Sequence, residues 1–270
     1  MAPFSPVITS PRNPQVKLAR ALHRRQTRYQ ERAFLVEGVR AIKDALASGA
    51  VPLILFYTED TLDDRIHAIA ATAAAVGTQV HPSTGAVLQL IIDTEHPQGI
   101  AAIFPIPEPR VLIPAGTEPL IVIADAIRDP GNLGTLIRSA LGSGANALFV
   151  TPGTVDPFNP KVVRAGMSTH FRLPIQSYNW EELPGVVSEF GQGIAADQNA
   201  SVAYDAIDWS IASFLIVGNE TAGLSPKARA LANGFASIPL ASGLESLNAG
   251  IAGSVILFEA ARQRRAQNLR

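Results

Sequence analysis

The chain has 270 residues, of which 47% are hydrophobic and 17% charged, and its formal net charge is −1. This composition excludes a disordered chain, and the absence of cysteine excludes disulfides, thiolate metal sites and a cysteine nucleophile. The five histidines lack metal-ligand spacing, so we expect no metal. Apolar runs are strand-sized and no secretory signal is recognisable, so we expect no membrane partner and a cytoplasmic protein.

The first hundred residues alternate between helical and strand patterns. A partial helical stripe covers 13–29, and further helices are expected at 39–48, 62–76 and 84–91. Strands are expected at 33–38, 51–57, 79–81 and 98–104. This alternation predicts a small α/β domain with a mainly parallel or mixed sheet.

Positive charge is concentrated near the start of the chain. Between Arg12 and Lys43 there are nine basic residues and two acidic ones. One interpretation is a solvated helix face, and the other is a surface that follows phosphates, because clustered cations gain affinity by releasing condensed counterions. The second interpretation predicts RNA-binding roles for Arg12, Lys17, Arg20, Arg24, Arg25 and Arg28.

A proline-rich stretch separates this domain from the rest of the chain. Five prolines between 104 and 119 disfavour a regular helix and favour an extended connector. We therefore predict a first domain at 1–104, a linker at 105–119 and a second domain at 120–270.

The second domain repeats the alternation on a larger scale. Helices are expected at 132–142, 160–168, 181–190, 226–233 and 246–265. Strands are expected at 120–124, 147–151, 173–176, 193–196, 214–217 and 236–239. The pattern predicts a parallel α/β sheet, and such sheets bind ligands at the carboxyl ends of their strands.

The first of three loops at such strand ends is Asp125–Gly134, which leads into a helix. Asn132 is expected to cap this helix, and capping alone would explain it. Arg138 lies about one helical turn past Gly134. It is either an ordinary surface residue or, near a helix start that faces the loop, a bidentate phosphate ligand.

The second and third loops follow later strands. In the second, the polar pair Asn219-Glu220 follows a buried strand, and Ser225 is expected to cap a helix that begins at Pro226. The third covers 242–248 and leads to the last helix, where exposed amides can bind an anion. Each could also be a plain loop, and we expect all three to build one site.

The last helix contains Gly250 and Gly253 near its start. Glycine inside a helix costs about 0.5–1 kcal/mol relative to alanine. Close approach by another helix or a ligand would offset that cost, and we hypothesise that a partner subunit makes this approach.

The three loops together resemble the three motifs of the SpoU (TrmH) family of S-adenosylmethionine-dependent RNA ribose 2′-O-methyltransferases, in the SPOUT superfamily. Motif one matches at Asn132, Gly134 and Arg138. The other two motifs match at 218–220 with 223–224, and at 238–240 with 245–248. The resemblance covers roughly 120–265. More loosely, 8–22 and 33–46 resemble the ribosomal-protein-like substrate-binding domain of rRNA-directed members.

This resemblance implies a homodimer and a C-terminal trefoil knot that holds the cofactor S-adenosylmethionine. It implies a catalytic group consisting of Arg138, Asn132, Glu220, Ser246 and Asn248. It implies cofactor contacts from Gly218, Asn219, Ile238, Leu240 and Leu247. The chain departs from the family at Gly250, where a serine is usual.

The expected activity is therefore methylation of a ribose 2′-hydroxyl in RNA, with 23S-type rRNA favoured by the N-terminal resemblance. A tRNA ribose methyltransferase and a non-catalytic RNA-binding module remain alternatives. A nicotinamide-dependent enzyme is disfavoured, because no G-x-G-x-x-G follows any expected strand.

Overall fold

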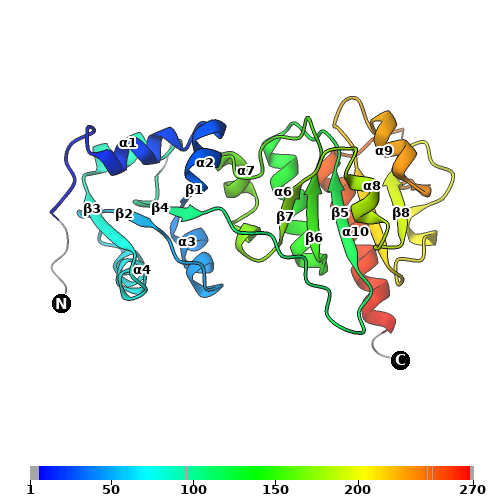
Figure 1. The fold of residues 1–270 in the computed structure, drawn as a ribbon, viewed down its shortest axis with the longest axis horizontal. Coiled ribbons are helices and arrows are strands. Elements are labelled where there is room, and N and C mark those ends of the chain that lie inside the picture. Colours follow the sequence, from blue (N-terminus) through cyan, green and yellow to red (C-terminus); the bar gives the residue numbers. More distant parts are fainter. Residues whose placement is uncertain (1–5, 95–96, 242, 245, 268–270) are drawn as a thin grey trace. The chain divides into compact units, whose positions relative to one another are not determined.

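A computed structural model describes residues 6–94, 97–241, 243–244 and 246–267. The chain forms two compact units, and most of their elements are labelled in Figure 1. The first unit contains Met1–Pro107 and Phe158–Phe171, and the second contains Glu108–Pro157 and Arg172–Arg270. Our sequence-based division assigned 158–171 to the second domain, and the structure corrects that assignment.

The first unit is built on a mixed sheet in the order β1-β4-β2-β3. Strand β4 is antiparallel to β1 and β2, whereas β2 and β3 are parallel. The strands are β1 (Ala33–Glu37), β2 (Ile54–Thr58), β3 (Gln79–Ser83) and β4 (Ile100–Pro105). The predicted mixed α/β domain is therefore correct.

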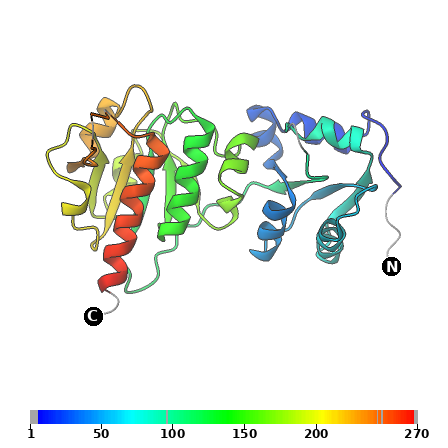
Figure 2. The same cartoon turned by 180° about the vertical axis from the view of Figure 1, so that it is seen from behind.

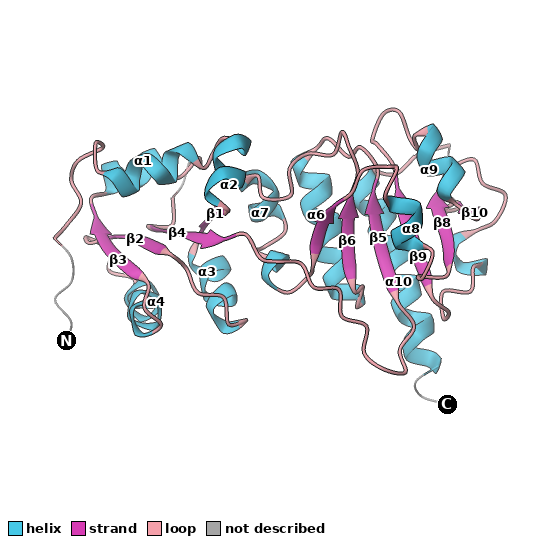
Figure 3. Cartoon of the chain, viewed as in Figure 1, coloured by secondary structure: helices cyan, strands magenta, loops and turns pink. Residues whose placement is uncertain are grey.

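Helices cover both faces of this sheet (Figure 3). One face packs against α1 (Pro14–Ala21) and α5 (Gly85–Ile91), and the other against α3 (Val39–Ala47) and α4 (Asp64–Ala75). The helical stripe expected at 13–29 is in fact two helices, because the backbone is extended at Arg24 before α2 (Arg25–Glu31).

The segment Phe158–Phe171 belongs to the first unit because it completes an aromatic cluster there. It contains α7 (Pro160–Ala165) and the short 3-10 helix η1 (Thr169–Phe171). Phe158 and Phe171 lie 5.1 and 5.5 Å from the ring of Phe34. Arg164 forms an ion pair with Glu37 of β1. Aromatic packing and one ion pair thus attach the segment to the first sheet.

The second unit has a six-stranded, fully parallel sheet in the order β10-β8-β9-β5-β6-β7. The central strands β5 and β9 are buried along their whole length, as expected for apolar runs covered on both faces. The strands are β5 (Leu120–Ala124), β6 (Ala147–Val150), β7 (Ile175–Ser177), β8 (Gln192–Ala196), β9 (Ser213–Val217) and β10 (Gly234–Ala236).

Two long helices pack side by side on one face of this sheet, α6 (Pro130–Ser143) and α10 (Ala249–Gln267), as Figure 2 shows. The shorter α8 (Leu183–Val187) and α9 (Pro226–Leu231) pack on the other face. Several predicted boundaries were wrong by two or three residues: for example, α6 begins at Pro130, α10 begins at Ala249, and β10 ends at Ala236. No helix among the described residues is long and apolar enough to cross a membrane.

The glycines of α10 are explained by α6 of the same chain. A Cβ atom at Gly250 would lie 2.9 Å from the carbonyl oxygen of Asn132, and one at Gly253 would lie 2.5 Å from Leu136. The hydroxyls of Ser139 and Ser254 join the two helices at 2.7 Å. Our hypothesis that a partner subunit requires these glycines was therefore wrong. The same contact explains why this chain tolerates no serine side chain at Gly250 without a shift of α6.

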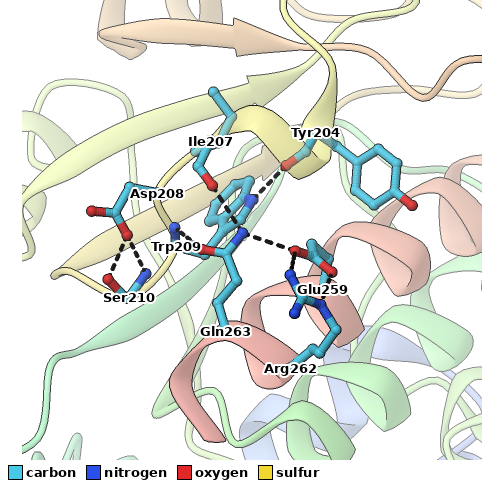
Figure 4. Close-up of polar contacts among 8 residues, drawn as sticks. All are labelled: Tyr204, Ile207, Asp208, Trp209, Ser210, Glu259, Arg262 and Gln263. Carbon is cyan, nitrogen blue, oxygen red and sulfur yellow. Dashed lines mark hydrogen bonds and ion pairs between the residues drawn. The ribbon is translucent and has the colours of Figure 1, made fainter. Parts of the chain in front are cut away.

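The far half of α10 is fastened to the loop that follows the 3-10 helix η2 (Tyr204–Ala206), as Figure 4 shows. The indole of Trp209 is fully buried, and its Nε1 donates to the carbonyl of Tyr204 at 2.8 Å. The backbone N–H of Trp209 donates to Oε1 of Gln263, whose Nε2 donates to Ile207 and Glu259. These contacts fix the helix whose first turns face the cavity described next.

Candidate functional site

A cavity of about 350 Å³ lies at the carboxyl ends of β8, β9 and β10, beside the start of α10. Its position is the one expected for the ligand site of a parallel sheet. All five residues predicted to contact a cofactor line it: Gly218, Asn219, Ile238, Leu240 and Leu247. Two of the five predicted catalytic residues, Glu220 and Ser246, also line it. Ser242 and Glu245 of the third loop lie outside the described residues.

The loop after β9 is held in shape by Asn219. Its Oδ1 accepts the N–H groups of Thr221 and Ala222, both at 2.9 Å, and its Nδ2 donates to the carbonyl of Ala126 at 2.7 Å. Any Cβ at Gly218 would lie 2.7 Å from the backbone of Gly223, so only glycine allows this closure. The side chain of Asn219 therefore builds the cavity wall and joins it to the loop after β5.

Hydrogen bonds connect the three sequence motifs through Asn132. Its Nδ2 donates to Oε1 of Glu220 at 2.9 Å, and its Oδ1 accepts Nδ2 of Asn248 at 2.5 Å. The helix cap is instead Asp129, whose carboxylate accepts the N–H of Asn132. Our prediction that Asn132 caps α6 was wrong, because the helix begins two residues earlier at Pro130. The amide is thus free to join the second and third loops.

Glu220 lies at the N-terminal end of α6. Partial burial acts to raise the pKa of its carboxyl group, but the hydrogen bond from Asn132 and those from the backbone N–H groups of Arg128 and Asp129 outweigh it and lower the pKa. The positive end of the helix dipole favours the same charged form. Glu220 is consequently a carboxylate at neutral pH that accepts three hydrogen bonds, and it is unsuited to act as a general acid.

Arg138 does not line the cavity of its own chain. It lies about two turns into α6 and is exposed, rather than at the helix start that we expected. The helix nevertheless carries both Arg138 and Asn132, so the hydrogen bonds of Asn132 fix the position of Arg138 relative to the second and third loops. Hydrogen bonds join three of the other predicted catalytic residues, Asn132, Glu220 and Asn248. Ser246 lines the cavity with Glu220, whereas Arg138 is exposed on α6.

Sequence reasoning missed two aspartates that follow strand ends. Asp125 follows β5, is 1% exposed, and accepts the N–H of Ser225 at 2.7 Å. Ser225 caps α9, which begins at Pro226 as predicted. Asp197 follows β8 and lines the cavity. The rule that singled out Asn219 and Glu220, a polar residue just after a buried strand, would have found both.

The predicted RNA-binding residues lie in the first unit, on and around α1 and α2. One of the six was wrong: Arg28 is 1% exposed, and its guanidinium donates to the carbonyls of Leu22 and His23 at the break between the helices. It satisfies backbone groups and is inaccessible to RNA. The guanidinium of Arg25 lies over the ring of Tyr29. The other five predicted residues are exposed, namely Arg12, Lys17, Arg20, Arg24 and Arg25.

The cavity can hold a flat apolar group with polar edges. Apolar residues such as Val217, Leu224 and Ile256 form part of its wall, together with polar residues of the strand-end loops such as Asp197 and Glu220. This mixture is typical of small-molecule sites, which are mostly apolar and contain a few polar groups. Among the described residues, no group of three histidine, aspartate or glutamate side chains could hold a metal ion.

Comparison with known proteins agrees with this geometry. Residues 119–258 match the SpoU rRNA Methylase family, and residues 13–102 match the MRM3-like substrate binding domain. The 23S rRNA (guanosine(2553)-2′-O)-methyltransferase RlmP of Bacillus subtilis is 32% identical over 93% of this chain and 97% of its own.

Two solved structures resemble the fold over nearly the whole chain. The AdoMet-bound rRNA methyltransferase from Sinorhizobium meliloti is 34% identical, with a TM-score of 0.83 over 95% of this chain and 97% of its own. The SpoU methyltransferase AviRb from Streptomyces viridochromogenes, in complex with AdoMet, is 30% identical, with a TM-score of 0.84 over 94% and 99%. The joined motif loops, the cavity and these matches lead to one conclusion: the chain belongs to the SpoU rRNA Methylase family.

Proposed function

We propose that this protein methylates a ribose 2′-hydroxyl of ribosomal RNA, with S-adenosylmethionine as methyl donor. The observation that carries the proposal is the cavity, which gathers residues of the second and third motifs at the ends of parallel strands. The relatives named above as rRNA methyltransferases support rRNA as the substrate. Transfer RNA is the alternative substrate class.

The residues of the cavity fit S-adenosylmethionine. Its volume and its apolar wall suit an adenine ring, and Gly218, Ile238 and Leu247 of that wall would hold the ring. When bound, the cofactor supplies an activated methyl group on a positively charged sulfur. Asn219 and Glu220 shape the adjoining loop through the hydrogen bonds described above, so the chain holds the cofactor mainly by packing and backbone groups.

Arg138 is proposed to act on the RNA. A guanidinium remains protonated in proteins, so Arg138 is unsuited to take the proton of the 2′-hydroxyl. It instead binds the neighbouring phosphate and stabilises the negative charge that develops on the attacking oxygen. Asn132 keeps the helix of Arg138 in register with the cofactor loops through Glu220 and Asn248. In the first unit, the exposed cations around α1 and α2 attract the RNA backbone.

We further propose a homodimer whose partner subunit brings RNA-binding groups to the cavity, and a knotted C-terminal segment. Ile251 and Phe258 of α10 are 51% and 49% exposed and lie seven residues apart on one face of the helix. Such an apolar face beside the exposed Arg138 supports an interface there.

Sedimentation should give a dimer for the native chain and a monomer for Phe258→Asp, and a monomeric native chain would contradict the proposal. A knot would shorten the fully stretched chain in single-molecule pulling.

The function is tested by mapping 2′-O-methylation on both rRNA and tRNA, from cells with and without the protein and after incubation with the purified chain. We expect one rRNA ribose to lose its methyl group without the protein and to regain it in vitro. Methylation restored on a tRNA would favour the alternative substrate. Absence of cofactor binding in calorimetry would support a non-catalytic RNA-binding module.

A further inference from the structure

Asp197 is a charged residue of the cavity wall that lies outside the three sequence motifs. It follows β8 directly, and its backbone N–H donates to the carbonyl of Ala236 in β10 at 3.0 Å. Its side chain is only 11% exposed. A carboxylate removed from water to this extent is costly unless it has partners, so its contacts define what it can bind.

Each carboxylate oxygen of Asp197 has its own partner in the chain. Oδ2 lies 2.8 Å from Nη1 of Arg229 on α9, and Oδ1 accepts the N–H of Asn199 at 3.0 Å. The guanidinium of Arg229 also lies over the ring of Phe235, 5.7 Å from its centroid. A carboxylate can accept about four hydrogen bonds. Asp197 therefore has remaining acceptor capacity beside the cavity, in an orientation fixed by two residues.

The ion pair decides which kind of ligand group suits this carboxylate. Arg229 compensates its charge, so a cationic group gains little from approaching the pair. Neutral donors such as hydroxyls gain a charge-assisted hydrogen bond without displacing Arg229. Glu220, the other acidic residue of the described cavity wall, already accepts three hydrogen bonds from Asn132, Arg128 and Asp129. Asp197 is thus the better acceptor for a ligand.

We propose that Asp197, held by Arg229, accepts hydrogen bonds from the ribose hydroxyls of the adenosine cofactor; this inference rests on the proposed function. An acidic residue at a strand end binds ribose in the same way in dinucleotide-binding sheets, where it selects hydroxyl-bearing ligands. The role of Asp197 is therefore specificity for the sugar of the cofactor. It does not require contact with the methyl group.

The test is calorimetry of the full chain with S-adenosylhomocysteine and with its 2′,3′-dideoxyribose analogue. The native protein should bind the analogue about tenfold more weakly, as expected for loss of a hydrogen bond to a charged acceptor. Asp197→Asn should bind S-adenosylhomocysteine about tenfold more weakly and should distinguish the two ligands by less than about threefold. Asp60→Asn, at an exposed position of the first unit, serves as the matched control and should behave as the native chain.

Two results would overturn the inference: equal affinity of the native chain for both ligands, or native affinity and discrimination in Asp197→Asn. The comparison of ligands on the native chain needs no variant, so it remains decisive if Asp197→Asn is unstable. Failure of the native chain to bind either ligand would instead contradict the proposed function. The two failures are thus distinguishable.

Discussion

Arg138→Ala is expected to lower kcat for ribose methylation on the order of 100-fold while leaving the Kd for S-adenosylmethionine unchanged. The side chain is exposed on α6 and outside the cavity, so its loss removes a group that acts on RNA and leaves the cofactor wall intact. Single-turnover kinetics measure the first quantity, and calorimetry measures the second. Arg110→Ala, at an exposed position near the start of the second unit, is the matched control and should retain native kcat.

Arg138→Lys separates a phosphate ligand from a general base. Lysine keeps the positive charge but loses the planar fork that binds phosphate in a bidentate manner. We therefore expect a rate that is reduced uniformly across pH. A retained rate with a shifted pH optimum would show that residue 138 takes a proton, and our proposal for Arg138 would then be wrong.

Trp209→Ala is expected to destabilise the protein by about 3–5 kcal/mol, because it removes a fully buried indole and leaves a cavity. The carbonyl of Tyr204 also loses its donor, and the loop that fastens α10 through Gln263 loses its packing. For a chain of this size the midpoint of thermal unfolding should fall by roughly 10 °C. Circular dichroism during heating measures the change.

Trp209→Phe is the comparison for that experiment. It keeps most of the buried ring and removes the Nε1 donor, so a loss of about 1–3 kcal/mol is expected from the unsatisfied carbonyl. If Trp209→Ala were no more destabilising than Trp209→Phe, packing of the indole would not be what holds this end of α10. The cofactor affinity of Trp209→Ala, measured at a temperature where it is folded, reports whether the fastened helix also shapes the cavity.

The central strands could be predicted because their residues are buried on both faces. Leu120–Ala124 and residues 214–217 are continuously apolar, and each run is followed directly by a polar residue or a glycine, which is a local signal. Helix starts were less accurate, since Asp129 and Asn132 are both good cap residues. Only the tertiary partners Glu220 and Asn248 show why Asn132 lies inside the helix.

The candidate site was predictable in its loops but incompletely in its chemistry. From the sequence alone a charged residue is expected to be exposed. Arg28 is nevertheless buried, because two backbone carbonyls at the break between the helices accept hydrogen bonds from its guanidinium. Asp197 directly follows a strand, which a local rule could have found, but its ion pair with Arg229 could not be predicted because the two residues are distant in sequence and meet only in the fold. Periodicity records which face of an element is apolar, and it carries no information on such long-range polar pairs.

The aromatic segment Phe158–Phe171 has a consequence for how the chain is synthesised. The strands of the first unit emerge early from the ribosome. Phe34 and Phe104 can pack against both Phe158 and Phe171 only after residue 171 has emerged. By then β5, α6 and β6 of the second unit are already outside the exit tunnel. The first unit therefore cannot complete its core before part of the second unit has been synthesised. During that period both hydrophobic cores are incomplete, and a chaperone could bind the exposed apolar residues.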